Sequence, residues 1–336
     1  MKKIAKDREY FIIAIIGIVF LLGLFVGDYY KLDIFITTLY FTSLACAWNI
    51  MCGFTGNLSL GHASFMGLAQ YTMIILYTRS GLSPWIGMLL GMVISAALAF
   101  FIGVLSLRLK SFYFTLSTIA LTVIFMLLSV RFEGLTGGSV GITVKYNPGF
   151  ANMTFSDPRV YYFLLAVVLI AILLFTCYMS KSRLGSNLVA IREDEVAAAS
   201  LGINVFKNKV IALVISALFT AAIGCIYMMY VLFIDPVSAF NAVTSNKCAI
   251  LTIIGGSGTV FGPLIGGLVL TPTEIFLRSW LGSTYQGAYL IIYGIILVCV
   301  VLFIPNGVYG TIKNKLAHAR SLREEKHAED LKKAEN

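Results

Sequence analysis

The sequence predicts an all-α membrane protein, a polytopic bundle of about 10 transmembrane helices (range 8–10). The chain has 336 residues, of which 59% are hydrophobic and only 12% charged, and its mean hydropathy is +0.89. Soluble domains carry roughly 25% charged residues, and a globule of this length has too little interior to hide so much apolar surface. The apolar runs are long and continuous, unlike the alternating strands of a transmembrane barrel.

Most of the predicted spans are uninterrupted apolar runs of about 20 residues, the length that crosses a bilayer as a helix. The first run follows a basic N-terminus, as a signal peptide would. It is longer than a signal core, and no small-x-small cleavage motif follows it before Asp28, so we expect a retained span. The uninterrupted spans are 10–27, 34–52, 62–78, 84–107, 112–130, 160–180, 210–233 and 285–304.

The region 243–278 is apolar but contains a cluster of glycines and a proline at its centre, and one helix cannot run through such a cluster undisturbed. We therefore expect two shorter helices, a descending one over 243–254 and a rising one over 259–277. The residues that break the pattern are Gly255, Gly256, Gly258, Gly262 and Pro263.

The distribution of basic residues predicts the topology. The formal charge is +9, and most Lys and Arg fall in 1–9, 108–111, 181–209 and 305–336, which alternate to one side of the membrane if ten spans are drawn. By the positive-inside rule this side is the cytoplasm, so both termini are expected there. No basic patch with interleaved aromatic residues occurs, so we expect no nucleic-acid partner.

Two regions follow from this pattern. Residues 1–312 form the transmembrane domain with membrane lipid around it, and 313–336 form a cytoplasmic tail that mixes charges of both signs without an apolar stripe. Such a tail is expected to be solvated.

The chain lacks the motifs of the common enzymes. No Walker A pattern is present, because the Gly-Gly-Ser-Gly-Thr run at 255–259 has no lysine, so no ATP site is expected on this chain. No catalytic residues and no metal site are predicted. The cysteines have no ligand spacing and are interpreted as small buried side chains; they are Cys46, Cys52, Cys177, Cys225, Cys248 and Cys299.

Ionisable residues are almost absent from the predicted spans. Ion-coupled transporters usually keep such residues inside the membrane, which argues against a self-sufficient secondary transporter. The exceptions are Lys247 and Glu274, which we place near the outer ends of the two short helices as an ion pair at an outer vestibule. Interface snorkelling and contact with a substrate are the two interpretations of this pair.

The segment 53–67 interrupts an apolar stretch with four glycines and several polar residues. Broken helix is tolerated at membrane depth only inside the protein or along an aqueous cavity, so this segment should lie within the bundle. Its small residues could allow close helix packing, or its amides could line a translocation path. The stretch 255–267 looks like a second copy. The path candidates are Gly53, Gly56, Asn57, Ser59, His62, Ser64, Gly255, Gly256, Ser257 and Gly258.

The cytoplasmic loop 181–209 contains a short charged helix rich in alanine. Acidic residues favour a helix N-terminus, alanines favour the helix itself, and a glycine ends it. A plain connector has little use for such an element, whereas a membrane protein driven by a separate soluble motor needs a surface where force is transferred. The candidate coupling residues are Glu193, Asp194, Glu195, Ala198 and Gly202.

The spacing of Glu195, Ala198 and Gly202 resembles the E-A-A…G coupling motif of ABC importer permeases. Together with 53–67, 134–142 and 255–267 it resembles the LivM-type permease subunit of branched-chain amino acid ABC importers, over about residues 34–310. The Gly-Phe-Thr-Gly-Asn-Leu-Ser-Leu-Gly-His-Ala-Ser-Phe block carries most of the specificity.

This resemblance implies a bacterial inner-membrane permease that works with a second homologous permease subunit, two cytosolic ABC ATPase subunits and an extracytoplasmic substrate-binding protein. ATP and Mg would bind to the ATPases, and no cofactor to this chain. The family commonly has Gln at the position of Asn57 and often Glu at that of Lys247. The alternatives are a permease for urea or short amides, a secondary transporter, and a membrane enzyme or scaffold.

Overall fold

The computed structural model describes residues 2–23, 27–108, 111–281, 287–303 and 307–311. The predicted tail 313–336 lies outside the described residues. The long helices are α1 (Lys2–Leu22), α2 (Tyr29–Trp48), α3 (His62–Ser80), α4 (Pro84–Ser106), α5 (Ser111–Arg131), α7 (Arg159–Lys181), α10 (Val205–Val231), α12 (Ala242–Gly256), α13 (Gly262–Leu281) and α14 (Ala288–Phe303). The short elements are η2 (Asn49–Gly53), α6 (Glu133–Thr136), η3 (Gly138–Val140), β1 (Ile142–Thr143), η4 (Phe150–Asn152), α8 (Arg183–Glu193), α9 (Glu195–Ser200), β2 (Phe233–Ile234) and α11 (Pro236–Ala239).

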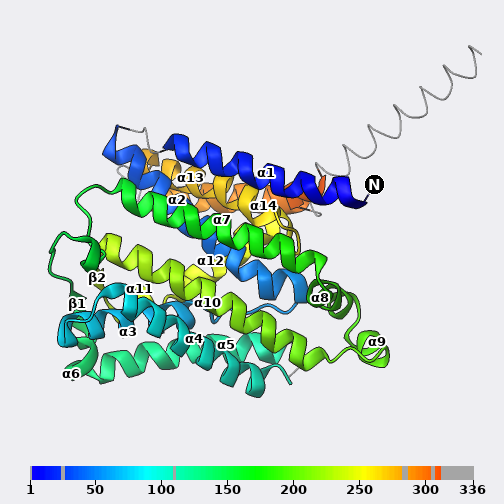
Figure 1. Ribbon diagram of the computed structural model, residues 1–336, viewed down its shortest axis with the longest axis horizontal. Coiled ribbons are helices and arrows are strands. Elements are labelled where there is room, and N and C mark those ends of the chain that lie inside the picture. Colours follow the sequence, from blue (N-terminus) through cyan, green and yellow to red (C-terminus); the bar gives the residue numbers. More distant parts are fainter. Residues whose placement is uncertain (1, 24–26, 109–110, 282–286, 304–306, 312–336) are drawn as a thin grey trace, which may run out of the picture.

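The long helices form one bundle whose centre is made by α2 and α10 (Figure 1). Helices α3 and α4 pack on α10, while α7, α12 and α13 pack on α2. Helix α1 lies along α7, and α14 lies against α13 at the edge of the bundle. The two central helices are therefore covered on several sides, which is where a polar site can be kept away from lipid.

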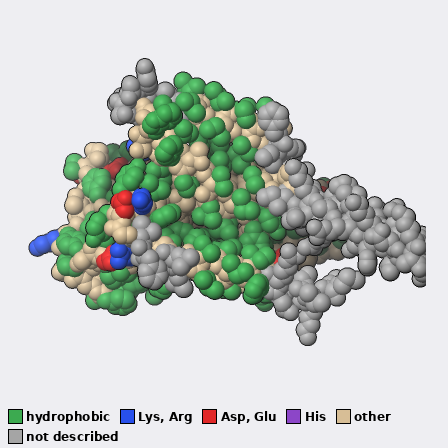
Figure 2. All heavy atoms as spheres, turned by 90° about the horizontal axis from the view of Figure 1, so that it is seen from above, with side chains coloured by type: hydrophobic (Ala, Val, Ile, Leu, Met, Phe, Trp, Pro, Cys, Tyr) green, Lys and Arg blue, Asp and Glu red, His purple; other side chains and the backbone are tan. Residues whose placement is uncertain are grey.

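Six helices in the described part of the chain are long and apolar enough to cross a membrane. The broad face over α1, α13 and α14 is mostly hydrophobic, and its few charged side chains gather toward one end (Figure 2). A helix also occupies each of the ten segments predicted as spans, but ten crossings and two cytoplasmic termini stay predictions. The six are Tyr29–Gly53, Pro84–Ser106, Phe112–Arg131, Arg159–Lys181, Val205–Val231 and Pro236–Gly256.

The predicted break in 243–278 is confirmed, because α12 ends at Gly256 and α13 begins at Gly262. The glycines here let two backbones touch. A Cβ at Gly255 would overlap the carbonyl oxygen of Gly262, and one at Gly266 would overlap that of Leu251. These glycines therefore allow α12 and α13 to pack closely.

The two ends of the bundle differ. Helices α8 and α9 lie at one end, together with the first residues of α1, whereas β1, β2, α6 and α11 lie at the other (Figure 1). An ion pair between Glu9 and Lys181 fastens the start of α1 to the end of α7. The N-terminal end of α1 and the loop 181–209 therefore share one end, as the predicted topology requires.

Three features differ from the expectations. Helix α8 was not predicted within 181–209. The loop 132–159 is held to the segment after α10 by antiparallel pairing of Ile142 with Ile234 and Thr143 with Phe233. This pairing was not predicted, because the two strands lie far apart in the sequence. Five cysteines are buried as expected, but Cys299 is exposed.

Candidate functional site

The first glycine-rich segment is a real interruption of the helical structure. Helix α2 passes into the π-helical turn η2, and the chain turns at Gly56, whose φ of +74° is left-handed. It resumes as α3 only at His62. The indole nitrogen of Trp48 donates to the carbonyl of Ser59 at 2.8 Å, which satisfies one of the backbone groups that the interruption frees.

Most of the segment is buried, as predicted. Asn57, Ser59, His62 and Ser64 are each at most 7% exposed, whereas Gly56 is exposed at the end of the bundle that carries α8. The segment thus runs from that end into the protein interior.

His62 donates a hydrogen bond from its Nε2 atom. Its Nε2 lies 2.8 Å from the hydroxyl oxygen of Ser216, and that hydroxyl donates its own proton to the carbonyl of Ala47 at 2.7 Å. Because a hydroxyl has only one proton, Nε2 must carry the proton in the histidine contact. This arrangement ties α3 to α10 and α2.

The N-terminus of α3 is satisfied by side chains from distant helices. The backbone nitrogen of Ala63 donates to Ser245 on α12 at 3.0 Å, and the Ser64 and Thr122 hydroxyls lie 2.8 Å apart. Helix starts leave several amides without an intrahelical partner, so these contacts position α12 and α5 around the start of α3.

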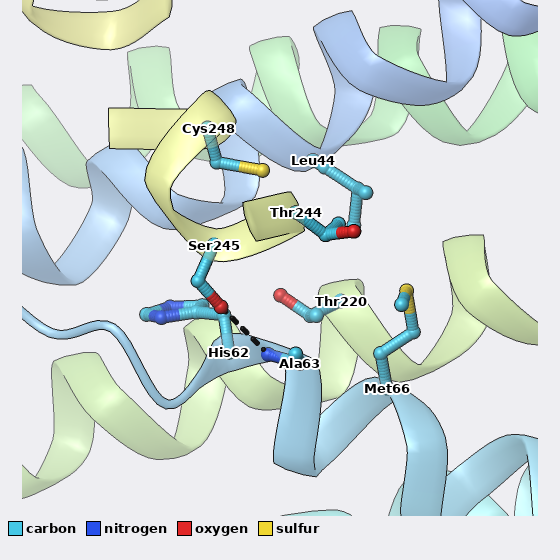
Figure 3. A pocket seen from close by; sticks show the side chains of 8 residues that line it. All are labelled: Leu44, His62, Ala63, Met66, Thr220, Thr244, Ser245 and Cys248. Carbon is cyan, nitrogen blue, oxygen red and sulfur yellow. Dashed lines mark hydrogen bonds between the residues drawn. The ribbon is translucent and has the colours of Figure 1, made fainter. Parts of the chain in front are cut away.

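A small polar cavity lies where α2, α3, α10 and α12 meet (Figure 3). Its volume is about 10 Å³, which is room for about one water molecule. The conformation described is therefore closed to any solute of amino-acid size at this point. The lining residues are Leu44, His62, Ala63, Met66, Thr220, Thr244, Ser245 and Cys248.

The two glycine-rich segments are brought together, which the sequence did not show. The Asn49 side chain accepts from the backbone nitrogen of Gly258 at 2.8 Å and donates to the carbonyl of Thr259 at 2.9 Å. A Cβ at Gly53 would overlap the Asn49 side chain, so this glycine makes room for the contact. A lone carboxamide in the apolar run 34–52 was the signal that could have identified Asn49.

The loop 181–209 is built from two helices, α8 and α9. Asp194 lies between them and caps α9, since its Oδ1 accepts from the backbone nitrogens of Val196 and Ala197 at 2.8 and 2.9 Å. Gly202 ends the second helix with a φ of +82°, as its predicted role requires. Glu193 was expected at the start of the short helix, but it is the last residue of α8, because the chain becomes extended at Asp194.

Helix α9 is fastened to α10 by a charge pair. The Lys209 ammonium lies 2.6 Å from a carboxylate oxygen of Glu195, and the lysine side chain is 2% exposed against 54% for the glutamate. Ala198 packs inward and is buried. Val196 on α9 and Leu201, the residue that follows the helix, are 76% and 81% exposed, so this element presents apolar side chains with no cover from the described part of the chain.

The predicted ion pair between Lys247 on α12 and Glu274 on α13 is present. Lys247 Nζ lies 2.7 Å from Glu274 Oε2, and it also stands 3.6 Å from the centre of the Phe41 ring. Both charged side chains are mostly buried. Charge compensation and a cation–π contact account for a lysine among apolar helices; a place at an outer vestibule stays a prediction.

Long apolar helices around a closed polar centre, with an exposed short helix at one end, define a multi-pass membrane protein. A family model described as the permease component of branched-chain amino acid transport systems matches residues 30–301, and the chain belongs to this family. It is a transport subunit rather than an enzyme.

Three relatives are informative. The chain is 26% identical over 301 residues to LivM, a high-affinity branched-chain amino acid permease protein of Salmonella typhimurium, which covers 83% of this chain and 69% of the relative. It is 30% identical over 144 residues to LivH, a high-affinity branched-chain amino acid permease protein of the same organism; the match covers 43% of this chain and 45% of the relative. It is 24% identical over 336 residues to LsrC, an autoinducer 2 import permease of Yersinia enterocolitica, covering 94% and 86%.

Proposed function

We propose that this chain is one of two permease subunits of an ABC importer for branched-chain amino acids in the bacterial inner membrane. The observation that carries the proposal is the exposed apolar face of α9, at the end of the bundle where the coupling motif lies. Two cytosolic ATPases dock on such helices, one on each permease, and supply ATP hydrolysis. An extracytoplasmic binding protein delivers the substrate to the opposite end.

The small size of the central cavity defines the change that the ATPases must produce. A cavity of about 10 Å³ cannot admit a branched-chain amino acid. Movement of α8 and α9 with the ATPases must therefore change the packing of α2, α3, α10 and α12 around it. The cavity lining has no fixed charge, and this suits a zwitterion that a separate binding protein has already selected.

Reconstitution tests the transport function. Proteoliposomes with this chain, a second permease and the ATPases, supplied with the binding protein, should accumulate leucine only with ATP, and isoleucine and valine should compete. Accumulation by this chain alone on an ion gradient would support a secondary transporter instead. If only urea or a short amide competed with leucine, the result would favour a permease for that class of substrate.

A docking variant tests the coupling surface. Val196→Asp should abolish copurification of the ATPases, because a carboxylate would then replace an apolar contact at the interface. The matched control is Val237→Asp, which is similarly exposed at the opposite end of the bundle. Equal loss in both variants, or loss in neither, would contradict α9 as the docking element.

A second candidate substrate comes from the similarity to LsrC, which spans nearly the whole chain. Autoinducer 2 would then replace leucine as the transported solute. Competition between the two solutes in the same proteoliposomes separates these functions.

A further inference from the structure

Arg192, in the last turn of α8, contacts both glycine-rich segments. Its Nη1 donates to the carbonyl of Gly53 at 2.9 Å and to that of Ser257 at 3.2 Å. The two carbonyls belong to segments about 200 residues apart in sequence, yet one guanidinium nitrogen bonds both. Hydrogen bonds from a charged donor are the stronger kind in proteins.

Glycines make room for this side chain. A Cβ at Gly258 would overlap Arg192 Nη1, and one at Gly56 would lie 3.2 Å from its Cγ. Both glycines have positive φ, of +71° and +74°, which side-chain-bearing residues rarely adopt. The absence of side chains at Gly56 and Gly258 thus leaves the space that the Arg192 side chain occupies.

Hydrogen bonds define two units here: the joined glycine-rich segments, and α8 with Arg192. Asn49 joins the two glycine-rich segments into one unit through bonds to Gly258 and Thr259, and it is buried. Arg192 joins that unit to α8 from the exposed side. Arg192 therefore attaches the loop that carries the coupling residues to the joined glycine-rich segments, while the buried Leu188 packs α8 into the core and the Glu195–Lys209 pair attaches α9 to α10.

A pocket of about 230 Å³ lies beside these contacts, and Arg192 forms part of its wall. It is far larger than the closed cavity of Figure 3. The remaining lining residues come from the two segments and the helices that lead into them: Trp48, Cys52, Gly53, Gly56, Leu58, Ile253 and Ser257.

We propose that Arg192 is the positioning residue that transmits movement of α8 and α9 to the joined glycine-rich segments, and that its two hydrogen bonds hold one wall of this pocket so that Cys52 stays buried. The inference rests on the proposed function, because it assigns the step between the docking surface and the path. When α8 moves away, the Gly53 and Ser257 carbonyls lose their donor and the wall of the pocket opens.

Accessibility of Cys52 tests the inference. In the assembled importer, in inside-out vesicles, Cys52 is kept as the sole cysteine and labelled with a membrane-impermeant maleimide. Arg192→Ala should raise the labelling rate roughly tenfold, the effect expected for loss of charged hydrogen bonds. Arg183→Ala is the control, since it removes an exposed arginine from the other end of the same helix.

A second readout separates transmission from a merely structural contact. Arg192→Ala should keep the ATPase rate near that of wild type while uptake per ATP falls roughly tenfold, and Arg192→Lys should restore part of the uptake, because an ammonium can still donate to a carbonyl. Gly258→Ala, whose Cβ would displace the guanidinium, should reproduce the labelling and uptake changes of Arg192→Ala.

Wild-type labelling of Cys52 in Arg192→Ala and Gly258→Ala, or an equal rise in Arg183→Ala, would overturn the inference. So would unchanged uptake per ATP. The labelling arm needs no transport, so it judges the role of Arg192 even if wild-type vesicles show no ATP-dependent uptake, a result that would count against the proposed function alone.

Discussion

The Glu195–Lys209 pair sets how firmly α9 is held to the bundle, and Glu195→Gln should loosen it. The substitution keeps the shape of the side chain but leaves the Lys209 ammonium, which is 2% exposed, without a compensating charge. Breaking a fully buried pair costs about 3–5 kcal/mol, whereas exposed pairs contribute about 0.2–1 kcal/mol. Because Glu195 is itself half-exposed, we expect about 2 kcal/mol, between these limits.

Lys209→Met removes the buried charge and replaces it with an apolar side chain of similar length. We expect it to cost less than Glu195→Gln, since no uncompensated ammonium remains. In the double variant, the Glu195→Gln change should then add almost nothing. The cycle of single and double variants isolates the energy of the pair.

Hydrogen exchange of the amides of α9, measured on the reconstituted chain, reads the local opening free energy directly. A cost of about 2 kcal/mol corresponds to roughly thirtyfold faster exchange in Glu195→Gln. Asp28→Asn is the control, because it removes the charge of an exposed pair with Lys31 and keeps a side chain that can cap α2. Exchange in Glu195→Gln within twofold of wild type would refute this account of Lys209.

Three further changes have defined outcomes. Asp194→Ala should destabilise α9 by about 1 kcal/mol through loss of its N-cap, seen as faster exchange of the first amides of that helix, and unchanged exchange would contradict the cap. Gly202→Ala should cost about 1 kcal/mol from the left-handed backbone alone, as the position opens onto empty space; Gly202→Asn, which tolerates this conformation better, should cost less. Gly255→Ala should lower thermal stability in detergent by more than Gly134→Ala. A Cβ at position 255 would overlap the backbone of Gly262, whereas one at position 134 would contact nothing; equal stability would count against close packing of α12 and α13.

Composition and apolar run length were sufficient to predict the helical membrane fold, and the cluster of glycines and a proline at the centre of 243–278 predicted the break before Gly262. Helix α8 was missed, although Leu184, Leu188 and Ile191 have helical spacing and the last two are buried. The strand pairing of Ile142 with Ile234 could not be predicted, because two-residue strands leave almost no pattern and their partners are far apart.

The candidate site was predicted in part. The coupling sequence identified Asp194 and Gly202, whose capping roles depend only on local backbone conformation. Arg192 and Lys209 were missed, because their importance comes from partners that the fold supplies from other segments. The sequence also left open whether the glycines serve packing or a path, and the contacts of Gly255 and Gly266 are those of packing.

The docking of ATPases on α9 is the central claim, and a photo-crosslinking residue at Leu201 in the assembled importer tests it most directly. The side chain is 81% exposed, so the crosslinker should reach a partner without disturbing the bundle. The account predicts a covalent adduct with the ATPase subunit from position 201 and none from position 237, at the opposite end. An adduct from neither position, in an importer that still transports, would contradict it.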